Sequence, residues 1–209
     1  MIELIVLGFA ILTLRRQLAA LEAGAPGAIL PVKSNARLIQ MAEYADRLFA
    51  EKKWLAAEKA YLGVLKLDHK NVTAYSHLGI IYSTQKNMVD AIECFQIAVR
   101  LKPSGATLQN LALAFYDNRN YIKSAAAFEK ANMLEPSAQR YVGLSKAHHK
   151  LHNADASITA LEKAVELDPS KRILQLLADA YDEAGRKDDA ATTKKRIREI
   201  AAEGATQSA

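Results

Sequence analysis

Three prolines of the chain are spaced 33 residues apart, and this regularity constrains the fold more than any other feature. Pro103, Pro136 and Pro169 each follow a leucine and a charged residue. Self-similarity at such a period is typical of solenoids, in which one small unit is stacked repeatedly. An ordinary helical bundle is the alternative, but a bundle gives no reason for its prolines to repeat. The sequence therefore predicts an all-α chain built from repeats.

Two rows of small and large side chains recur with the prolines. Both rows have spacings of three and four residues, which place their members on one face of a helix. The downstream row is Ala57/Tyr61/Val64, Ala91/Phe95/Ala98, Ser124/Phe128/Ala131 and Ser157/Leu161/Ala164. The upstream row is Tyr44/Ala45/Leu48, Leu78/Gly79/Tyr82, Leu111/Ala112/Phe115, Leu144/Ser145/His148 and Leu177/Ala178/Tyr181. Because small side chains let two helix backbones approach closely, we expect the aromatic rings of one helix to fill gaps beside the small residues of another.

Polar stretches separate the upstream row from the downstream row, and they suit tight turns between helices. These stretches are 51–53, 85–87, 118–120, 152–153 and 184–186. Proline lacks a backbone N–H and clashes with the preceding turn, so each repeated proline marks the end of a second helix. The pattern predicts helix–turn–helix repeats that cannot bury their apolar faces alone.

At these residues the chain resembles the tetratricopeptide repeat family, whose pattern combines Leu–Gly/Ala–aromatic in a first helix with Ala–aromatic–Ala and Pro in a second. The best match is Tyr75, Leu78, Gly79, Tyr82, Ala91, Phe95, Ala98 and Pro103. The resemblance implies a right-handed superhelical solenoid of about five repeats within 38–200. Their expected ranges are 38–71, 72–104, 105–137, 138–170 and 171–200. Lys194 replaces an apolar residue of the other repeats, so we expect the last helix to be a cap, followed by a flexible tail at 201–209.

The amino terminus is almost wholly apolar from Ile2 to Leu14 and is followed directly by Arg15 and Arg16. A cleaved secretory signal carries its positive charge before the apolar stretch, so we exclude one here. Thirteen helical residues reach only about 20 Å, against about 30 Å for the hydrocarbon core of a bilayer. A span therefore requires that the helix continue to Glu22 and that the arginines snorkel.

We predict an amino-terminal hydrophobic helix at 1–23 that anchors the chain to a membrane, and a tether at 24–37. The positive-inside rule then places the repeats on the cytoplasmic side. The anchor residues are Ile2, Leu4, Ile5, Val6, Leu7, Phe9, Ile11, Leu12, Leu14, Arg15 and Arg16. The alternative is a helix that inserts into a partner subunit or into the open end of the solenoid.

The net charge of +5 is spread along the chain without a basic stripe interleaved with aromatic residues, so we expect no nucleic-acid partner. The single cysteine, Cys94, excludes an internal disulfide and lies beside Phe95 on a packing helix. It is therefore interpreted as a buried, inert thiol.

In a superhelix of such repeats the first helices line the concave surface, and residues not used for packing form a groove. We predict that this groove binds a protein or peptide segment through apolar anchors and an asparagine that grips the peptide backbone. The groove residues are Ser76, His77, Ile80, Gln109, Asn110, Leu113, Tyr116, Val142, Lys146, His149, Arg172 and Asp179, and the first repeat adds Asp46 and Phe49 to the same face. Along the groove the charge changes from positive near Lys146 to negative near Asp179. The alternative is that these are ordinary surface residues.

Chemistry for catalysis or cofactor binding is not found in the sequence. The only plausible metal cluster is His148, His149 and His152, but His148 occupies a packing position and His152 lies at a turn. The chain has no phosphate-binding glycine loop and no serine nucleophile elbow. We therefore expect no metal, no cofactor and no enzyme activity. The sequence favours a membrane-tethered adaptor, and the alternative is a structural subunit whose repeats self-associate.

Overall fold

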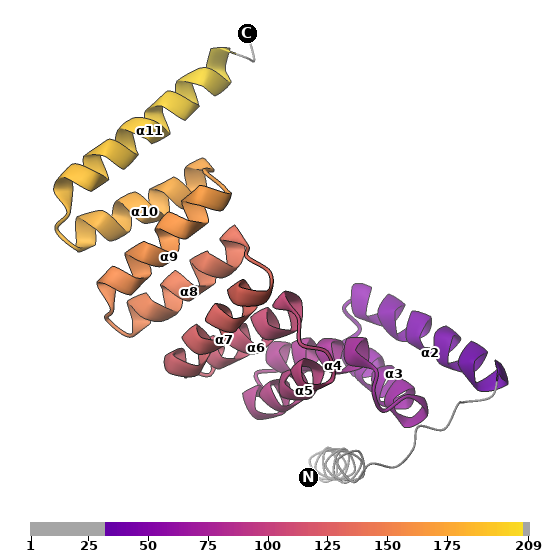
Figure 1. Cartoon of the computed structure of the whole chain (residues 1–209). Coiled ribbons are helices and arrows are strands. Elements are labelled where there is room, and N and C mark those ends of the chain that lie inside the picture. The colour runs from indigo at the N-terminus through magenta and orange to yellow at the C-terminus, as the bar shows by residue number, and fades with distance from the viewer. Residues whose placement is uncertain (1–31, 207–209) are drawn as a thin grey trace. The chain divides into compact units, whose positions relative to one another are not determined.

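The computed structural model describes residues 32–206, and every regular element in that range is an α-helix (Figure 1). Consecutive helices are joined in pairs as helical hairpins. The pairs are α2 (Val32–Ala50) with α3 (Trp54–Leu67), α4 (Val72–Thr84) with α5 (Met88–Leu101), α6 (Gly105–Asp117) with α7 (Tyr121–Leu134), α8 (Ala138–Lys150) with α9 (Ala154–Leu167), and α10 (Lys171–Glu183) with α11 (Lys187–Thr206). The predicted fold class, all-α with helix–turn–helix repeats, is confirmed for these residues.

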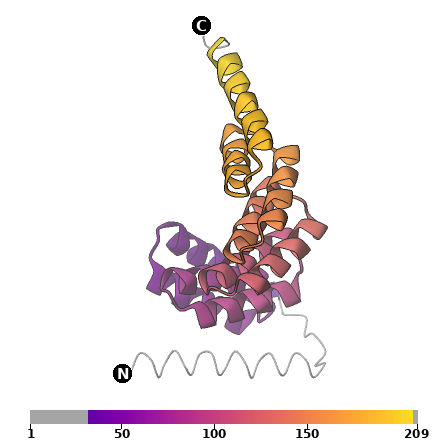
Figure 2. The ribbon, with the colours of Figure 1, turned by 90° about the vertical axis from the view of Figure 1, so that its left-hand side faces the viewer.

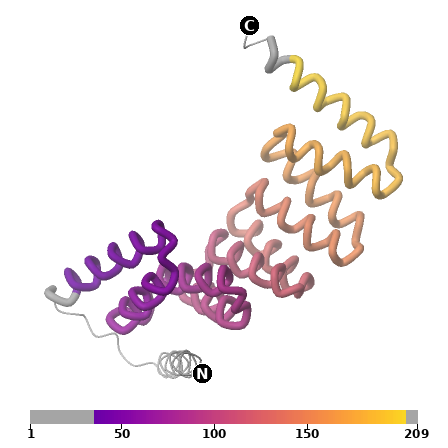
Figure 3. Tube along the Cα trace, turned by 180° about the vertical axis from the view of Figure 1, so that it is seen from behind, coloured from indigo at the N-terminus to yellow at the C-terminus, as the bar shows by residue number. Residues whose placement is uncertain are grey.

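The helices form two compact units that divide after Leu101. The described part of the first unit contains α2–α5, and that of the second unit contains α6–α11. Within each unit every helix packs against the next one along the chain. In the second unit, α10 and α11 run alongside each other (Figure 2), and short turns connect the helices of each hairpin along the chain trace (Figure 3).

Helix starts repeat with the same period as the prolines. The first helices α4, α6, α8 and α10 begin at Val72, Gly105, Ala138 and Lys171, and each has 13 residues. The second helices α5, α7 and α9 each have 14 residues and end two positions before Pro103, Pro136 and Pro169. Proline disfavours a helical conformation at the residue before it, which explains these endings.

The turn inside each hairpin contains one residue with a left-handed backbone. The positive φ angles are 57° at Lys52, 64° at Lys86, 59° at Arg119, 55° at His152 and 74° at Gly185. In three hairpins an asparagine follows, and its side-chain oxygen accepts a hydrogen bond from the backbone N–H three residues later. Such an asparagine satisfies one of the unpaired donors at the start of the second helix.

Aromatic rings of the second helices fill the space beside small residues of the first helices. A Cβ added at Gly79 would lie 2.6 Å from the Phe95 ring, and one added at Gly143 would lie 2.4 Å from the Phe128 ring. The expectation that aromatic rings fill gaps beside small residues is therefore confirmed. In the second unit the core continues through Ile158, Leu174 and Ile197.

Helices at both ends of the described range extend beyond the ranges expected for the repeats. Helix α2 begins at Val32, inside the segment 24–37 that we expected as a tether, because residues 32–37 contain no proline or glycine that would stop a helix. Helix α11 continues to Thr206, into the expected tail at 201–209, because Ala201, Ala202 and Glu203 favour a helix. The predicted anchor at 1–23 lies outside the described residues. Between residues 32 and 206 there is no helix with the length and apolar character needed to cross a membrane.

Candidate binding site on the first helices

A pocket of about 240 Å³ lies between α8, α9 and α10 in the second unit. Lys146 and His149 line it from α8, and Asp179 and Glu183 line it from α10. Leu161 of α9 contributes an apolar surface. The structure therefore brings together four predicted groove residues from two successive first helices: Val142, Lys146, His149 and Asp179.

Lys146 brings a positive charge to the α8 side of this pocket, and Asp179 and Glu183 bring negative charges to the α10 side. The His149 Nδ1 atom lies 3.5 Å from a Glu183 carboxylate oxygen, and both side chains are well exposed. The sequence suggested that positive charge gives way to negative charge along the groove; the structure places the two signs on facing helices. A pocket of this kind can accept a ligand segment that carries both an acidic and a basic group.

Helix α6 adds an apolar and aromatic surface within the same unit. Leu113 remains 45% exposed although it is a large apolar residue. The Tyr116 ring packs edge-on against the Tyr121 ring with centroids 5.3 Å apart, and partial burial raises the pKa of the Tyr116 hydroxyl. Asn110, the residue predicted to bind a peptide backbone, is half-buried. Three predicted residues thus lie on α6 with surface left to contact a ligand.

Two other predicted groove residues bind neighbouring hairpins. The Arg140 Nε donates to Gln109 Oε1 at 3.0 Å, and Arg172 Nη2 donates to Gln139 Oε1 at 3.1 Å. These hydrogen bonds connect successive first helices, so Gln109 and Arg172 have a structural partner. Sequence reasoning missed Arg140, and the signal that could have found it is the near-repeat spacing between Gln109 and Arg140.

Val142, a further predicted groove residue, lines the same pocket but is almost fully buried. Its side chain is 1% exposed and belongs to the core formed with Ile158 and Leu174. The following hairpin covers this side of α8, so Val142 offers a ligand in the pocket very little surface. A single helix cannot reveal that coverage, since it depends on packing between hairpins.

In the first unit, predicted residue His77 lies in a hydrogen-bonded cluster with Asp46 and Tyr61. The Tyr61 hydroxyl donates to Asp46 Oδ1 at 2.6 Å and lies 2.5 Å from His77 Nδ1. Because the hydroxyl has one hydrogen, donation to Asp46 requires that His77 Nδ1 carry the proton and donate to the Tyr61 oxygen. His77 Nε2 is then left as an acceptor. Sequence reasoning assigned Tyr61 to packing alone and missed this role.

The surroundings of His77 favour its neutral form. The Phe49 ring stacks on the imidazole at 4.3 Å between centroids. Burial lowers the pKa of His77 and outweighs the nearby Asp46 carboxylate, which acts in the opposite direction. The other predicted residues of α4, Ser76 and Ile80, are half-buried, and Ser76 Oγ donates to the Val72 carbonyl of its own helix at 2.9 Å.

The histidines considered as metal ligands are not gathered at one site. His148 Nε2 lies 3.8 Å from Glu129 Oε1, and His152 occupies a left-handed turn. Among residues 32–206, no three His, Cys, Asp or Glu side chains are placed to hold a metal ion. Cys94 is buried and unpaired, and burial raises the pKa of its thiol. A thiol that stays protonated is a poor nucleophile.

Comparisons with known proteins agree with this geometry. Models of the tetratricopeptide repeat family match residues 45–106 and 138–171. A crystal structure of MamA is 27% identical with a TM-score of 0.70, covering 78% of this chain and 96% of that one. A second MamA crystal structure is 26% identical with a TM-score of 0.73, covering 81% of this chain and 94% of that one.

More distant structures share the fold. MamA from Desulfovibrio magneticus RS-1 is 16% identical with a TM-score of 0.70, covering 79% of this chain and 96% of that one. YrrB, described as a TPR protein with an unusual peptide-binding site, is 16% identical with a TM-score of 0.64, covering 77% of this chain and 84% of that one. No curated protein sequence matches the chain. The hairpins, their spacing and these matches lead to one conclusion: residues 45–106 and 138–171 carry tetratricopeptide repeats.

Proposed function

We propose that the chain is a non-enzymatic scaffold that binds a segment of a partner protein on the first-helix face of its second unit. This face consists of Asn110, Leu113, Tyr116, Lys146, His149 and Asp179. The observation that carries the proposal is the pocket between α8 and α10, where basic and acidic side chains face each other beside apolar Leu161. The shared fold with YrrB, which is described as having a peptide-binding site, supports a peptide ligand on such a scaffold.

The chemistry of the first-helix face defines the expected ligand. Leu113 and Tyr116 offer apolar and aromatic surface for an anchor side chain of the partner. The Asn110 amide can both donate to and accept from a peptide backbone. Lys146 and Asp179 then favour a segment that carries an acidic and a basic residue, because matched charges fix the register of binding.

The test is photo-crosslinking from a probe residue at position 149 of the full chain, followed by mass spectrometry of the crosslinked partner. Triple replacement of Asn110, Leu113 and Tyr116 by alanine should weaken capture at least about tenfold, because anchor residues dominate the energy of such interfaces. The matched control is Ile122→Ala, which removes a 71% exposed apolar side chain from α7 outside this face. Capture that survives the triple replacement but is lost in the control would place the site on the second helices.

We propose further that residues 1–23 anchor the scaffold to a membrane and that the repeats face the cytoplasm. The support is the apolar run Ile2–Leu14 followed by Arg15 and Arg16. A membrane tether confines the first-helix face to two dimensions and raises the effective concentration of a partner held at the same surface. This would favour assembly of a complex at the membrane.

A further inference from the structure

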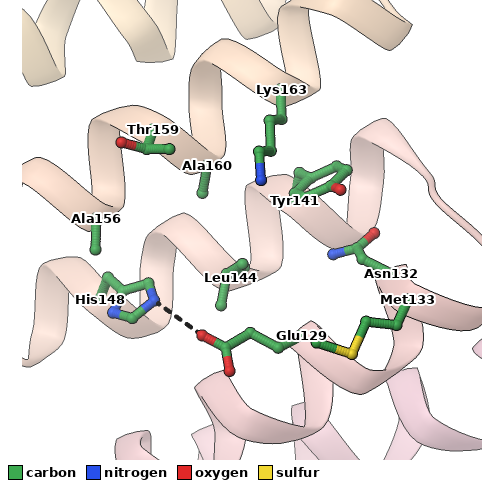
Figure 4. A pocket seen from close by; sticks show the side chains of 10 residues that line it. All are labelled: Glu129, Asn132, Met133, Tyr141, Leu144, His148, Ala156, Thr159, Ala160 and Lys163. Atoms are coloured by element: carbon green, nitrogen blue, oxygen red, sulfur yellow. Dashed lines mark ion pairs between the residues drawn. The ribbon is translucent and has the colours of Figure 1, made fainter.

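A larger pocket, of about 420 Å³, lies between α7, α8 and α9 in the second unit (Figure 4). Its volume is within the range of about 300–1,000 Å³ that is usual for small-molecule sites. It shares no lining residue with the pocket of the first-helix face. The two pockets can therefore be occupied and tested independently.

The inner surface of this pocket is mainly apolar. Leu144, Ala156 and Ala160 line it from α8 and α9, and the Met133 side chain of α7 lies at its edge, 81% exposed. An unbranched methionine adapts its shape to a ligand more easily than other apolar side chains. These residues suit an aliphatic chain.

One buried polar group of the pocket has no hydrogen-bond partner within the described residues. Asn132 is 5% exposed, and its Oδ1 accepts a hydrogen bond from the Ser137 backbone N–H at 3.2 Å. That bond fixes the orientation of the amide, because the N–H needs an acceptor. The Asn132 Nδ2 consequently remains an unpaired buried donor. Figure 4 shows this nitrogen turned toward the space beside Tyr141 and Leu144.

The charged groups of the pocket are distributed unequally. Glu129 is paired with His148, whose Nε2 lies 3.8 Å from Glu129 Oε1. The Lys163 ammonium lies over the Tyr141 ring, 5.7 Å from its centroid, and has no carboxylate partner within residues 32–206. On this side of the pocket the Lys163 ammonium and the Asn132 Nδ2 are therefore donors without an acceptor among residues 32–206, and the Tyr141 hydroxyl, which also lines the pocket, can donate or accept.

We propose that this pocket binds an aliphatic carboxylate. The carboxylate accepts hydrogen bonds from Lys163 Nζ and Asn132 Nδ2, and the aliphatic chain lies against Leu144 and Ala160. A carboxylate suits this position because it accepts several hydrogen bonds and carries the charge opposite to that of Lys163. Binding also satisfies Asn132 Nδ2, the one buried side-chain donor of residues 32–206 that has no partner.

The test is titration of the full chain with octanoate, monitored by calorimetry and by the ¹H–¹⁵N signals of the Asn132 side chain. Octanoate should shift those signals, and 1-octanol and octylammonium should bind at least about tenfold more weakly because neither supplies a negatively charged acceptor. Asn132→Asp keeps the acceptor for the Ser137 N–H but removes the donor and adds a repelling charge. Lys163→Met keeps the length of the side chain and removes its charge.

Each of these two variants should weaken octanoate binding at least about tenfold, because each removes one hydrogen bond to a charged group. The exposed Lys130 of α7 does not line the pocket, so Lys130→Met should bind as the unmodified chain does. Lys146→Met, a change in the first-helix face, should also leave octanoate binding intact. If Asn132→Asp fails to fold, Lys163→Met alone decides the outcome.

The proposal is overturned if octanoate leaves the Asn132 signals unchanged, if 1-octanol binds equally well, or if Lys163→Met binds like the unmodified chain. A blocked peptide containing Leu-Glu distinguishes the source of the carboxylate. Tighter binding of octanoate assigns the site to a free acid. Tighter binding of the peptide, lost in the same variants, assigns the carboxylate to a partner polypeptide.

Discussion

The turns inside the five described hairpins each use a left-handed residue, yet only Gly185 is a glycine. Residues with a side chain are strained in this conformation by about 1–2 kcal/mol, whereas glycine is not. Lys52, Lys86, Arg119 and His152 therefore occupy positions that glycine would fit with less strain. A sequence search for glycine finds only one of these turns, which is why the polar stretches are the better signal.

Gly185→Ala should destabilise the chain by about 1 kcal/mol, because alanine is strained at a φ of 74°. A Cβ at this position would meet nothing within 4 Å, so the loss is attributable to the backbone alone. Arg119→Gly should change the stability in the opposite direction, that is, it should raise the free energy of unfolding. Urea denaturation measures both changes. Equal stability of the two variants would contradict the explanation.

The cluster of Asp46, Tyr61 and His77 makes stability depend on pH. Burial lowers the pKa of His77 in the folded state, so the unfolded chain binds a proton more readily than the folded chain does. The stabilising contribution is complete above the unfolded pKa of about 6.5 and is lost as the pH falls from there through the lower folded value.

We expect the free energy of unfolding to fall as the pH is reduced from about 7.5 to about 5.5, because His77 must then be protonated in a buried site. His77→Phe retains an aromatic ring against Phe49 and should flatten this dependence. Urea denaturation at several pH values measures how the free energy of unfolding of each chain depends on pH. If acidification stabilised the unmodified chain relative to His77→Phe, attraction by Asp46 would outweigh burial.

Pairs of helices are held close together by a small residue on one helix and an aromatic ring on the other. The turns inside the hairpins and the ends of α5, α7 and α9 could be predicted from the sequence, because polar turn residues and proline act locally. The burial of Val142 could not be predicted in this way, because it depends on the hairpin that follows. The contact of Arg140 with Gln109 and the pocket around Asn132 likewise require knowing how neighbouring hairpins pack.

Gly79→Ala should lower the stability by about 1–3 kcal/mol, because the new methyl group would lie 2.6 Å from the Phe95 ring and the ring must move. Phe95→Leu in the same chain should recover part of that loss. A double-mutant cycle by urea denaturation measures the coupling. Additive effects of the two substitutions would show that α4 and α5 do not meet as described.

On the scale of the whole molecule, the proposed function needs both the first-helix face and a membrane anchor, and only the sequence predicts the anchor. The first-helix face lies in the second unit, whereas the proposed anchor at 1–23 lies outside the described residues. Gln109 and Arg172 bond to neighbouring hairpins, and Val142 is buried, so only part of the predicted groove is open to a ligand. Which residues share a face could be predicted from helical spacing; which of them remain available could not.

Fractionation tests the proposed anchor. The full chain should sediment with membranes and resist extraction by high salt and by alkali until detergent is added, since burial of the apolar run Ile2–Leu14 does not depend on charge. Removal of residues 1–23 should release the chain. Extraction by alkali without detergent would instead indicate that the helix inserts into a partner subunit.

The constant interval between helix starts has a consequence for how such a chain can grow. The first helices α4, α6, α8 and α10 begin 33 residues apart. Duplication of one such block would reproduce the left-handed turn, the helix cap and the terminal proline together. An insertion of another length inside a block would place a turn where a helix must continue. The chain can therefore lengthen by whole hairpins while keeping its existing contacts, which makes the size of its surface easy to change by gene duplication.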